Sequence, residues 1–151
     1  MKTKLPDKPS ELIRLALSDM KAILKNPKFK VRMDVYMEYV NPDDKRCTVC
    51  LAGSVMANTL KIKPSRKRQF GHSPADFEDA DEDTYRKLRA INALRNGSAS
   101  YAFEILKLSG KEKAKKLIRN IKYNYPENAL QRKNFINEME IFANDLQAAG
   151  F

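Results

Sequence analysis

The sequence predicts a mainly α-helical, compact single-domain fold of about five helices, with a minor β element near residues 30–40. Apolar residues recur at intervals of three and four over most of the chain, as on one face of a helix. One short stretch alternates apolar and polar residues instead, as in a strand. The length of 151 residues matches one domain, and no repeat or low-complexity tract divides residues 1–151.

The first predicted element is a helix from about Pro9 to Lys25. Proline fits the first turn of a helix, where its missing N–H costs no hydrogen bond. Asn26-Pro27 ends the helix, because the proline ring disfavours helical geometry in the residue before it. The apolar positions at helical spacing are Leu12, Ile13, Ala16, Leu17, Met20, Ile23 and Leu24.

The next segment, Lys30 to Tyr39, has a period of two and predicts a strand. The alternating apolar positions are Val31, Met33, Val35, Met37 and Tyr39. After a polar turn, Arg46 to Leu51 has two interpretations: the second strand of a hairpin, or part of a helix that starts near Cys47 and continues through Leu60. We favour the helix, because Leu51, Val55 and Met56 have helical spacing and the neighbouring small residues allow close packing.

Residues 61–81 form the least regular segment, and its charges segregate. Basic residues come first, and an acidic run from Asp76 to Asp83 follows. This run has no calcium-loop spacing. It precedes a predicted helix from about Asp81 to Arg95, where negative charge favours the positive end of the helix dipole.

Three further helices are predicted over about Ser98–Leu108, Lys111–Tyr123 and Glu127–Ala148, separated by Gly110 and Pro126. The second is expected to bury Ala114, Leu117, Ile118 and Ile121. The third is expected to bury Leu130, Phe135, Ile136, Met139, Phe142, Ala143 and Leu146.

Composition and charge exclude several classes of protein. The 29 Lys and Arg residues exceed the 19 Asp and Glu residues and give a formal charge of +10. No apolar stretch approaches the roughly 18 residues of a membrane span, and no apolar segment follows the basic N-terminal residues as in a secretory signal. We therefore expect a reducing, cytoplasmic setting and no membrane partner.

Cys47 and Cys50 form one C-x-x-C pair, for which three interpretations remain. As a redox pair, the first cysteine would lie at a helix N-terminus, which lowers a thiol pKa. As a metal site, the pair supplies only two of the four ligands of structural zinc. As packing groups, both thiols behave as small apolar side chains. We favour packing and predict neither a metal site nor a cofactor.

The single histidine, His72, lies among Gly71, Ser73 and Pro74, which are typical of a loop. A general base would need an orienting carboxylate and a nucleophile nearby, and no companion motif supplies them. We interpret His72 as a surface residue. The sequence shows no assembled catalytic set, although a small cysteine-dependent enzyme using Cys47 or Cys50 stays an alternative.

The basic residues predict a binding surface for nucleic acid or another partner. One cluster precedes Phe70, and the other lies on a predicted helix close to Tyr123 and Tyr125. Cations in a band contact phosphates, and adjacent aromatic rings stack on unpaired bases. The opposing interpretation is a solvated, Lys-rich surface. The residues of the predicted patch are Lys61, Lys63, Arg66, Lys67, Arg68, Lys115, Lys116 and Arg119.

Three segments resemble a group of small, uncharacterised proteins of tailed bacteriophages. They are Asn26 to Asp34, the run C-x-x-C-x-A-G-x-V-M-A from Cys47 to Ala57, and the helix D-x-x-T-x-x-x-L-R-A-x-x-A-L-R-x-G from Asp81 to Gly97. The likeness covers about the first two-thirds of the chain. Many of these proteins have Trp-His where this chain has Tyr36-Met37, so no role of that histidine carries over.

The resemblance implies a phage accessory protein that acts in the host cytoplasm. Together with the missing catalytic set and the uneven charge, it predicts a non-enzymatic protein that binds and modulates a host protein or a protein–nucleic acid assembly. The alternatives are a sequence-nonspecific nucleic-acid-binding protein and the cysteine-dependent enzyme.

Overall fold

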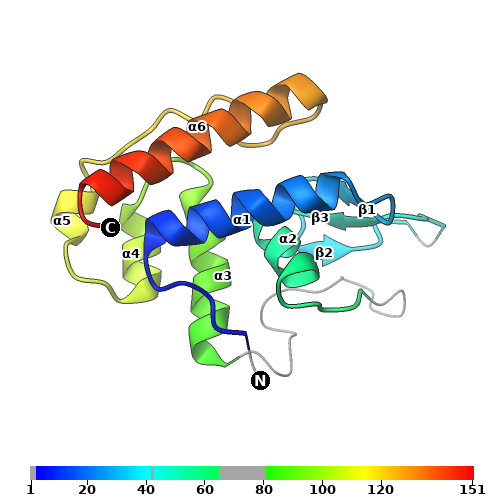
Figure 1. The fold of residues 1–151 in the computed structure, drawn as a ribbon, viewed down its shortest axis with the longest axis horizontal. Coiled ribbons are helices and arrows are strands. Elements are labelled where there is room, and N and C mark those ends of the chain that lie inside the picture. Colours follow the sequence, from blue (N-terminus) through cyan, green and yellow to red (C-terminus); the bar gives the residue numbers. More distant parts are fainter. Residues whose placement is uncertain (1–2, 42, 65–80) are drawn as a thin grey trace.

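The computed structural model describes residues 3–41, 43–64 and 81–151. These residues contain six helices and a small three-stranded sheet, and helices account for 52% of them. The expectation of a mainly helical fold with a minor β element is therefore confirmed. Figure 1 shows the sheet at one end of the molecule and the helices α3 to α5 toward the other, with α1 running between them.

Helix α1 (Pro9–Leu24) confirms the first predicted element and is the centre of the fold. It packs against α2, α3 and α6. Its first turn is tied to the last residue of the chain, because the backbone N–H and the hydroxyl of Ser10 donate to the carbonyl oxygen of Phe151 at 3.2 and 3.0 Å. The Phe151 ring packs edge-on against Phe103, with the ring centroids 4.6 Å apart.

The sheet consists of β1 (Phe29–Val31), β2 (Met37–Glu38) and β3 (Cys47–Val49), with β3 in the centre. β1 is parallel to β3, and β2 is antiparallel to it. The prediction of one continuous strand over residues 30–39 is therefore wrong. β1 and β2 pair with opposite edges of β3, so the chain has to reverse between them.

The helix that we expected to start near Cys47 begins later. Residues Cys47–Val49 are the buried central strand, and α2 (Leu51–Asn58) follows. Strand pairing on both sides satisfies the backbone of β3, which local helical spacing does not reveal. Cys50 is the N-cap of α2, and its Sγ accepts a hydrogen bond from the N–H of Gly53 at 3.3 Å.

Helix α3 (Glu82–Leu94) confirms the element predicted from the acidic run. Asp81 is its N-cap and accepts a hydrogen bond from the N–H of Thr84 at 2.8 Å. Helix α4 (Ser100–Leu106) follows after a turn at Gly97, whose φ is +79°. The positive φ at Gly97 is one that only glycine adopts readily.

The prediction of a helix over residues 111–123 is wrong beyond its first turn. Only α5 (Lys111–Ala114) is helical. The chain then becomes extended, because the N–H of Arg119 donates to the carbonyl of Gly97 at 2.8 Å. Ile118, expected inside, has 71% of its surface exposed, whereas Ile121 is buried.

Helix α6 (Ala129–Ala148) lies beside α1 and completes the core (Figure 1). Its N-cap Asn128 accepts a hydrogen bond from the N–H of Gln131 at 2.9 Å. Leu130 was expected in the core but is 68% exposed, because it lies in the first turn of α6 on the side away from the core. The buried side chains of α6 are Phe135, Met139, Phe142, Ala143 and Leu146, and they join one apolar cluster with those of α1 to α5 and the sheet.

Candidate functional site

Both cysteines are buried and neither is in a disulfide. Cys47 lies in the central strand, and Cys50 caps α2. Burial raises the pKa of the Cys50 thiol, and the hydrogen bonds from the backbone around Gly53 only partly oppose this effect. A thiol with a raised pKa is a poor nucleophile and metal ligand at neutral pH. The geometry favours the interpretation of the pair as packing groups.

The two clusters of the predicted basic patch do not form one surface among the described residues. Lys61 and Lys63 are exposed just after α2, whereas Lys115, Lys116 and Arg119 follow α5, which Figure 1 shows at the opposite side of the molecule. Four residues singled out in the sequence lie outside the described residues: Arg66, Lys67, Arg68 and His72. The part of the acidic run before residue 81 lies outside them too.

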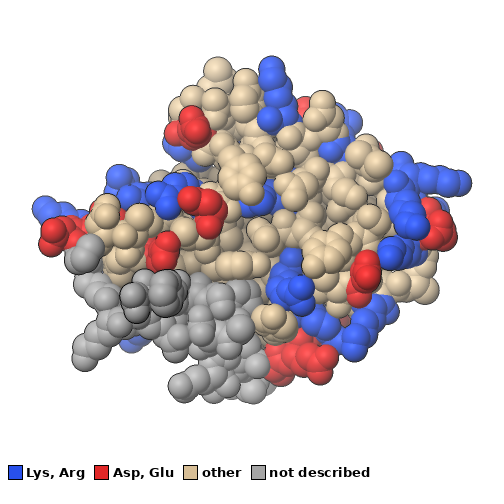
Figure 2. All heavy atoms as spheres, turned by 180° about the vertical axis from the view of Figure 1, so that it is seen from behind, with Lys and Arg blue, Asp and Glu red and all other residues tan. Residues whose placement is uncertain are grey.

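The cluster after α5 is partly neutralised by carboxylates. Lys115 pairs with Glu112 at 2.9 Å, and Arg119 pairs with Glu138 at 2.9 Å. Figure 2 shows the corresponding edge of the molecule from behind, with Lys and Arg side chains interspersed with Asp and Glu. Such an edge lacks the continuous positive band that duplex phosphates need.

A different basic surface lies along the seam between α1 and α6. Two cavities of about 440 and 360 Å³ open there, and they share Lys21 and Glu140, so that they form one groove. We call it the α1–α6 groove. Its basic rim is formed by Arg14, Lys21, Arg132 and Lys133. Its apolar floor is formed by Leu17, Leu24 and Ile136.

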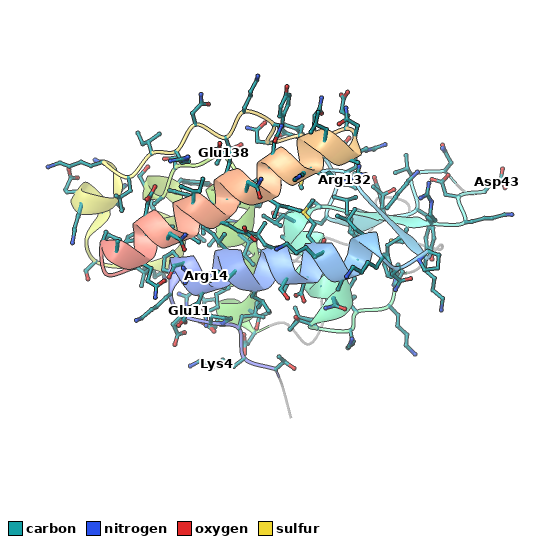
Figure 3. All side chains as sticks on the ribbon, turned by 45° about the horizontal axis from the view of Figure 1, so that its top comes forward. Lys4, Glu11, Arg14, Asp43, Arg132 and Glu138 are labelled. Carbon is teal, nitrogen blue, oxygen red and sulfur yellow. The ribbon has the colours of Figure 1, made fainter. Side chains whose placement is uncertain are left out.

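Three of the rim cations have no carboxylate partner among the described residues. Arg14 donates from Nη2 to the neutral amide oxygens of Asn144 at 2.8 Å and Gln147 at 2.7 Å. Arg132 and Lys133 form no ion pair within the described ranges. Figure 3 shows Arg14 and Arg132 in the seam, whereas Glu11 and Glu138 lie on the outer sides of the two helices. The groove therefore carries a surplus of positive charge.

Lys21 is the exception on the rim, because it crosses the seam to Glu140 at 2.7 Å. Both side chains of this pair are about half exposed, so the pair contributes little to stability. Beyond it, toward the N-terminal end of α6, the two helices lie farther apart (Figure 3), and the larger of the two cavities lies there. Leu24, at 39% exposure, and the half-buried Ile136 line this larger cavity.

Sequence reasoning missed this groove. Its rim comes from the first and the last helix, and each helix alone reads as an ordinary amphipathic element with a solvated polar face. The clusters of adjacent lysines and arginines drew attention instead. One signal in the sequence was Leu24, an apolar residue close to Lys21 and Lys25 at the end of α1. The structure shows that its side chain is exposed.

Clusters of metal-ligating side chains and membrane-spanning helices are both absent from the described part of the chain. Its His, Cys, Asp and Glu side chains form no group of three or more that could hold a metal ion. None of its helices combines the length and the apolar character needed to cross a bilayer. Comparisons with protein-family models, curated proteins and solved structures gave no match.

Proposed function

We propose that this is a non-enzymatic binding protein, and that its α1–α6 groove holds an acidic, amphipathic segment of a protein partner. One observation carries the proposal: the groove combines an apolar floor with three rim cations, Arg14, Arg132 and Lys133, that no carboxylate of the described residues neutralises. Carboxylates of a partner would pair with Arg14, Arg132 and Lys133, and its apolar side chains would cover Leu24 and Ile136.

The geometry fits the helix-in-groove mode of recognition. In that mode an amphipathic helix places its apolar face on the floor of a groove, and its polar flanks meet the rim. Burial of apolar surface supplies most of the affinity, at about 25 cal/mol per Å². The exposed rim cations add little affinity, but they accelerate encounter with an acidic partner and reject a basic one.

The setting that we propose follows from the sequence resemblance. A small accessory protein of phage type, acting in the host cytoplasm, would use the groove to bind and modulate a host protein. Nothing in the geometry of the buried cysteines supports the alternative of a thiol-dependent enzyme. The alternative of a nucleic-acid-binding protein becomes an outcome of the test.

The test is capture of a partner from host lysate, with and without nuclease, by three forms of the protein. These are the unaltered protein, Arg132→Glu/Lys133→Glu in the groove, and the matched control Lys115→Glu/Lys116→Glu after α5. Both double variants change the net charge by the same amount. Circular dichroism establishes that each retains its helical content.

We expect the unaltered protein and the control to retain the same host protein after nuclease treatment. The groove variant should lose it, because two unpaired rim cations become carboxylates that repel an acidic partner. Retention by the groove variant would contradict the proposal. Capture that disappears with nuclease, or fails only for the control, would instead support a nucleic-acid partner on the predicted basic patch.

A further inference from the structure

A further cavity, of about 310 Å³, lies between α3 and α4, and Tyr36 from the β1–β2 connection forms part of its wall. We call it the α3–α4 pocket. Its volume is at the lower end of the range of small-molecule sites. Unlike the groove, it is lined mainly by side chains with hydrogen-bonding groups, namely Tyr36, Arg89, Asn92, Asn96, Ser98 and Tyr101.

Arg89 gives the pocket a positive charge that no carboxylate of the described residues neutralises. Its guanidinium is held by aromatic groups instead. Nη2 lies 3.5 Å from the hydroxyl of Tyr101, and the guanidinium carbon lies 5.5 Å from the centre of the Tyr85 ring. This arrangement orients a planar fork of N–H donors and leaves most of them available to an anion.

A second guanidinium strengthens the positive potential behind the pocket wall. Arg95 is only 5% exposed and also has no carboxylate partner within the described residues. It donates to the carbonyl of Met33 at 2.6 Å and to the hydroxyl of Tyr125 at 2.9 Å, while its Nε forms no hydrogen bond to any described residue. A buried cation without a counter-ion is costly, and a nearby anion reduces that cost.

The two guanidiniums act on the same wall of the pocket. Burial raises the pKa of Tyr36 to about 12, while Arg89 and Arg95 both oppose this shift. Both positive charges therefore reach the Tyr36 side of the cavity. Tyr101, which also lines the cavity, has 55% of its surface exposed, so part of its side chain is accessible to a ligand.

We propose that the α3–α4 pocket binds a small ligand with a phosphate group on a ring system, the chemical class of a nucleoside monophosphate. Arg89 pairs with the phosphate through its planar fork. The ring of Tyr101 stacks on the base. The amides of Asn92 and Asn96 offer both donors and acceptors to the edge of the base.

The experiment is an NMR titration of the full chain with each of the four common nucleoside monophosphates, at concentrations up to about 10 mM, in the weak-binding range. Inorganic phosphate and adenosine are titrated separately, because they carry the two halves of the ligand. We expect at least one nucleotide to shift the backbone amide signals of Asn92, Asn96 and Ser98. Each half alone should act on the same amides with at least tenfold lower affinity.

Two variants on α3 decide whether Arg89 is responsible. Arg89→Gln should weaken nucleotide binding at least tenfold. The matched control Arg86→Gln, one turn away and already paired with Glu82 and Asp83, should leave it unchanged. Arg89→Lys should give an intermediate affinity, because it keeps the charge and loses the planar fork. Amide signals outside the pocket report whether each variant keeps the fold.

The proposal is overturned if none of the four nucleotides shifts the pocket amides, or if the shifts fall elsewhere. It is also overturned if Arg89→Gln and Arg86→Gln bind alike. Phosphate alone acting as strongly as a nucleotide would show an anion site without recognition of the ring, which contradicts the stated ligand class. The groove variant Arg132→Glu/Lys133→Glu should bind the nucleotide normally, so the two proposals stand or fall separately.

Discussion

Asp19 and Lys87 are ionisable side chains buried in the fold. Burial disfavours the charged form of both, and their partners decide whether that form is kept. Asp19 is 3% exposed and accepts hydrogen bonds from Asn58 at 2.7 Å and Thr59 at 2.5 Å. Burial raises the pKa of Asp19 above its ordinary value, and the two neutral donors together with the positive charge of Lys61 only partly oppose the shift. Hydrogen bonds from neutral donors satisfy the oxygens without themselves supplying a counter-charge.

Lys87 has two carboxylate partners, and their effect on its pKa exceeds that of burial. Burial lowers the pKa of Lys87, but hydrogen bonds from its ammonium group to Asp7 and Asp83 outweigh burial and raise the pKa above its ordinary value. The same ammonium donates to the carbonyl of Leu5 at 2.8 Å. The hydrogen bond from Lys87 in turn lowers the pKa of Asp7. Lys87 therefore stays charged and fixes the segment before α1 to α3.

The buried carboxylate predicts a particular pH dependence. Because the pKa of Asp19 is higher in the folded than in the unfolded state, protonation stabilises the fold. This contribution is fully present below the ordinary Asp pKa of 3.8 and is lost as the pH rises through the folded pKa. Asp19→Asn removes the titration and retains an oxygen that can accept from Asn58.

We therefore expect the free energy of unfolding of Asp19→Asn, relative to that of the unaltered protein, to be higher at pH 7 than at pH 4. The measurement is the free energy of unfolding of both proteins by denaturant at several pH values. All other titrating groups are shared, so they cancel in the difference. A difference that does not change with pH, or that changes in the opposite direction, would refute the raised pKa.

At the scale of the element, the junction of β3 and α2 depends on one glycine. A Cβ added to Gly53 would lie 1.7 Å from the carbonyl oxygen of Tyr36. That carbonyl also accepts a hydrogen bond from the N–H of Cys50 at 3.2 Å. The first turn of α2 is thus pressed against the backbone of the β1–β2 connection, which agrees with the close packing expected from the small residues there.

Gly53→Ala should therefore destabilise the protein by about 3 kcal/mol or more, because neither backbone can move aside as a side chain does. Helix propensity alone would give the opposite sign, a gain of about 1 kcal/mol for Ala over Gly. Gly150→Ala serves as the control. Its φ is +92° but no atom lies within 4 Å of the added Cβ, so only the backbone strain of about 1–2 kcal/mol applies. Denaturant unfolding distinguishes these outcomes, and a stabilised Gly53→Ala variant would contradict the close approach.

Whether an element could be predicted from the sequence depended on how far apart in the chain the residues lie that stabilise it. Helices α1, α3 and α6 were predicted to within a few residues, because periodicity and flanking residues act locally. The strand at Cys47–Val49 was the alternative that we weighed and set aside in favour of a helix, and the end of α5 at Ala114 was not predicted. The strand depends on pairing with β1 and β2, and the end of α5 on the hydrogen bond between Arg119 and Gly97. Partners this far apart in the chain leave no local pattern.

The candidate sites were harder to predict for the same reason. The groove brings Arg14 together with Arg132, and the pocket brings Tyr36 together with Arg89 and Tyr101. Of these residues only Arg89 lies in a pattern singled out in the sequence, the run from Asp81 to Gly97, and that pattern does not indicate a pocket. The sequence instead drew attention to runs of like residues, such as Lys115 and Lys116, of which Lys115 pairs with Glu112 in the folded molecule. The excess of basic residues can be read from the sequence. Which of these cations lack a carboxylate partner among the described residues can be read only from the folded molecule.

At the scale of the whole molecule, the buried apolar side chains from all six helices and the sheet form one cluster. Phe135 is fully buried in it, whereas Leu117, expected to be equally buried, only packs against its edge. We expect Phe135→Ala to cost about 3–5 kcal/mol and Leu117→Ala distinctly less, because a half-exposed side chain loses less contact and leaves no closed cavity.

Because the cluster is continuous, unfolding should be a single cooperative transition. Far-UV circular dichroism and tyrosine fluorescence should give coincident midpoints, and Phe135→Ala should lower both by the same amount. Separate transitions, or a shift in one probe only, would show that the helices and the sheet are stabilised independently. Equal costs for Phe135→Ala and Leu117→Ala would contradict the burial of the two side chains.

The position of α1 and α6 in the chain also determines when the groove can exist. The side-chain hydrogen bonds across the seam join residues 119 to 133 positions apart, and closing such a long loop is entropically unfavourable until other contacts support it. On the ribosome, α1 emerges well before α6, and it has no seam until α6 has left the exit tunnel and docked. A growing chain therefore presents no groove to a partner, and occupancy of the groove would report that synthesis has passed α6 and that its helix is in place.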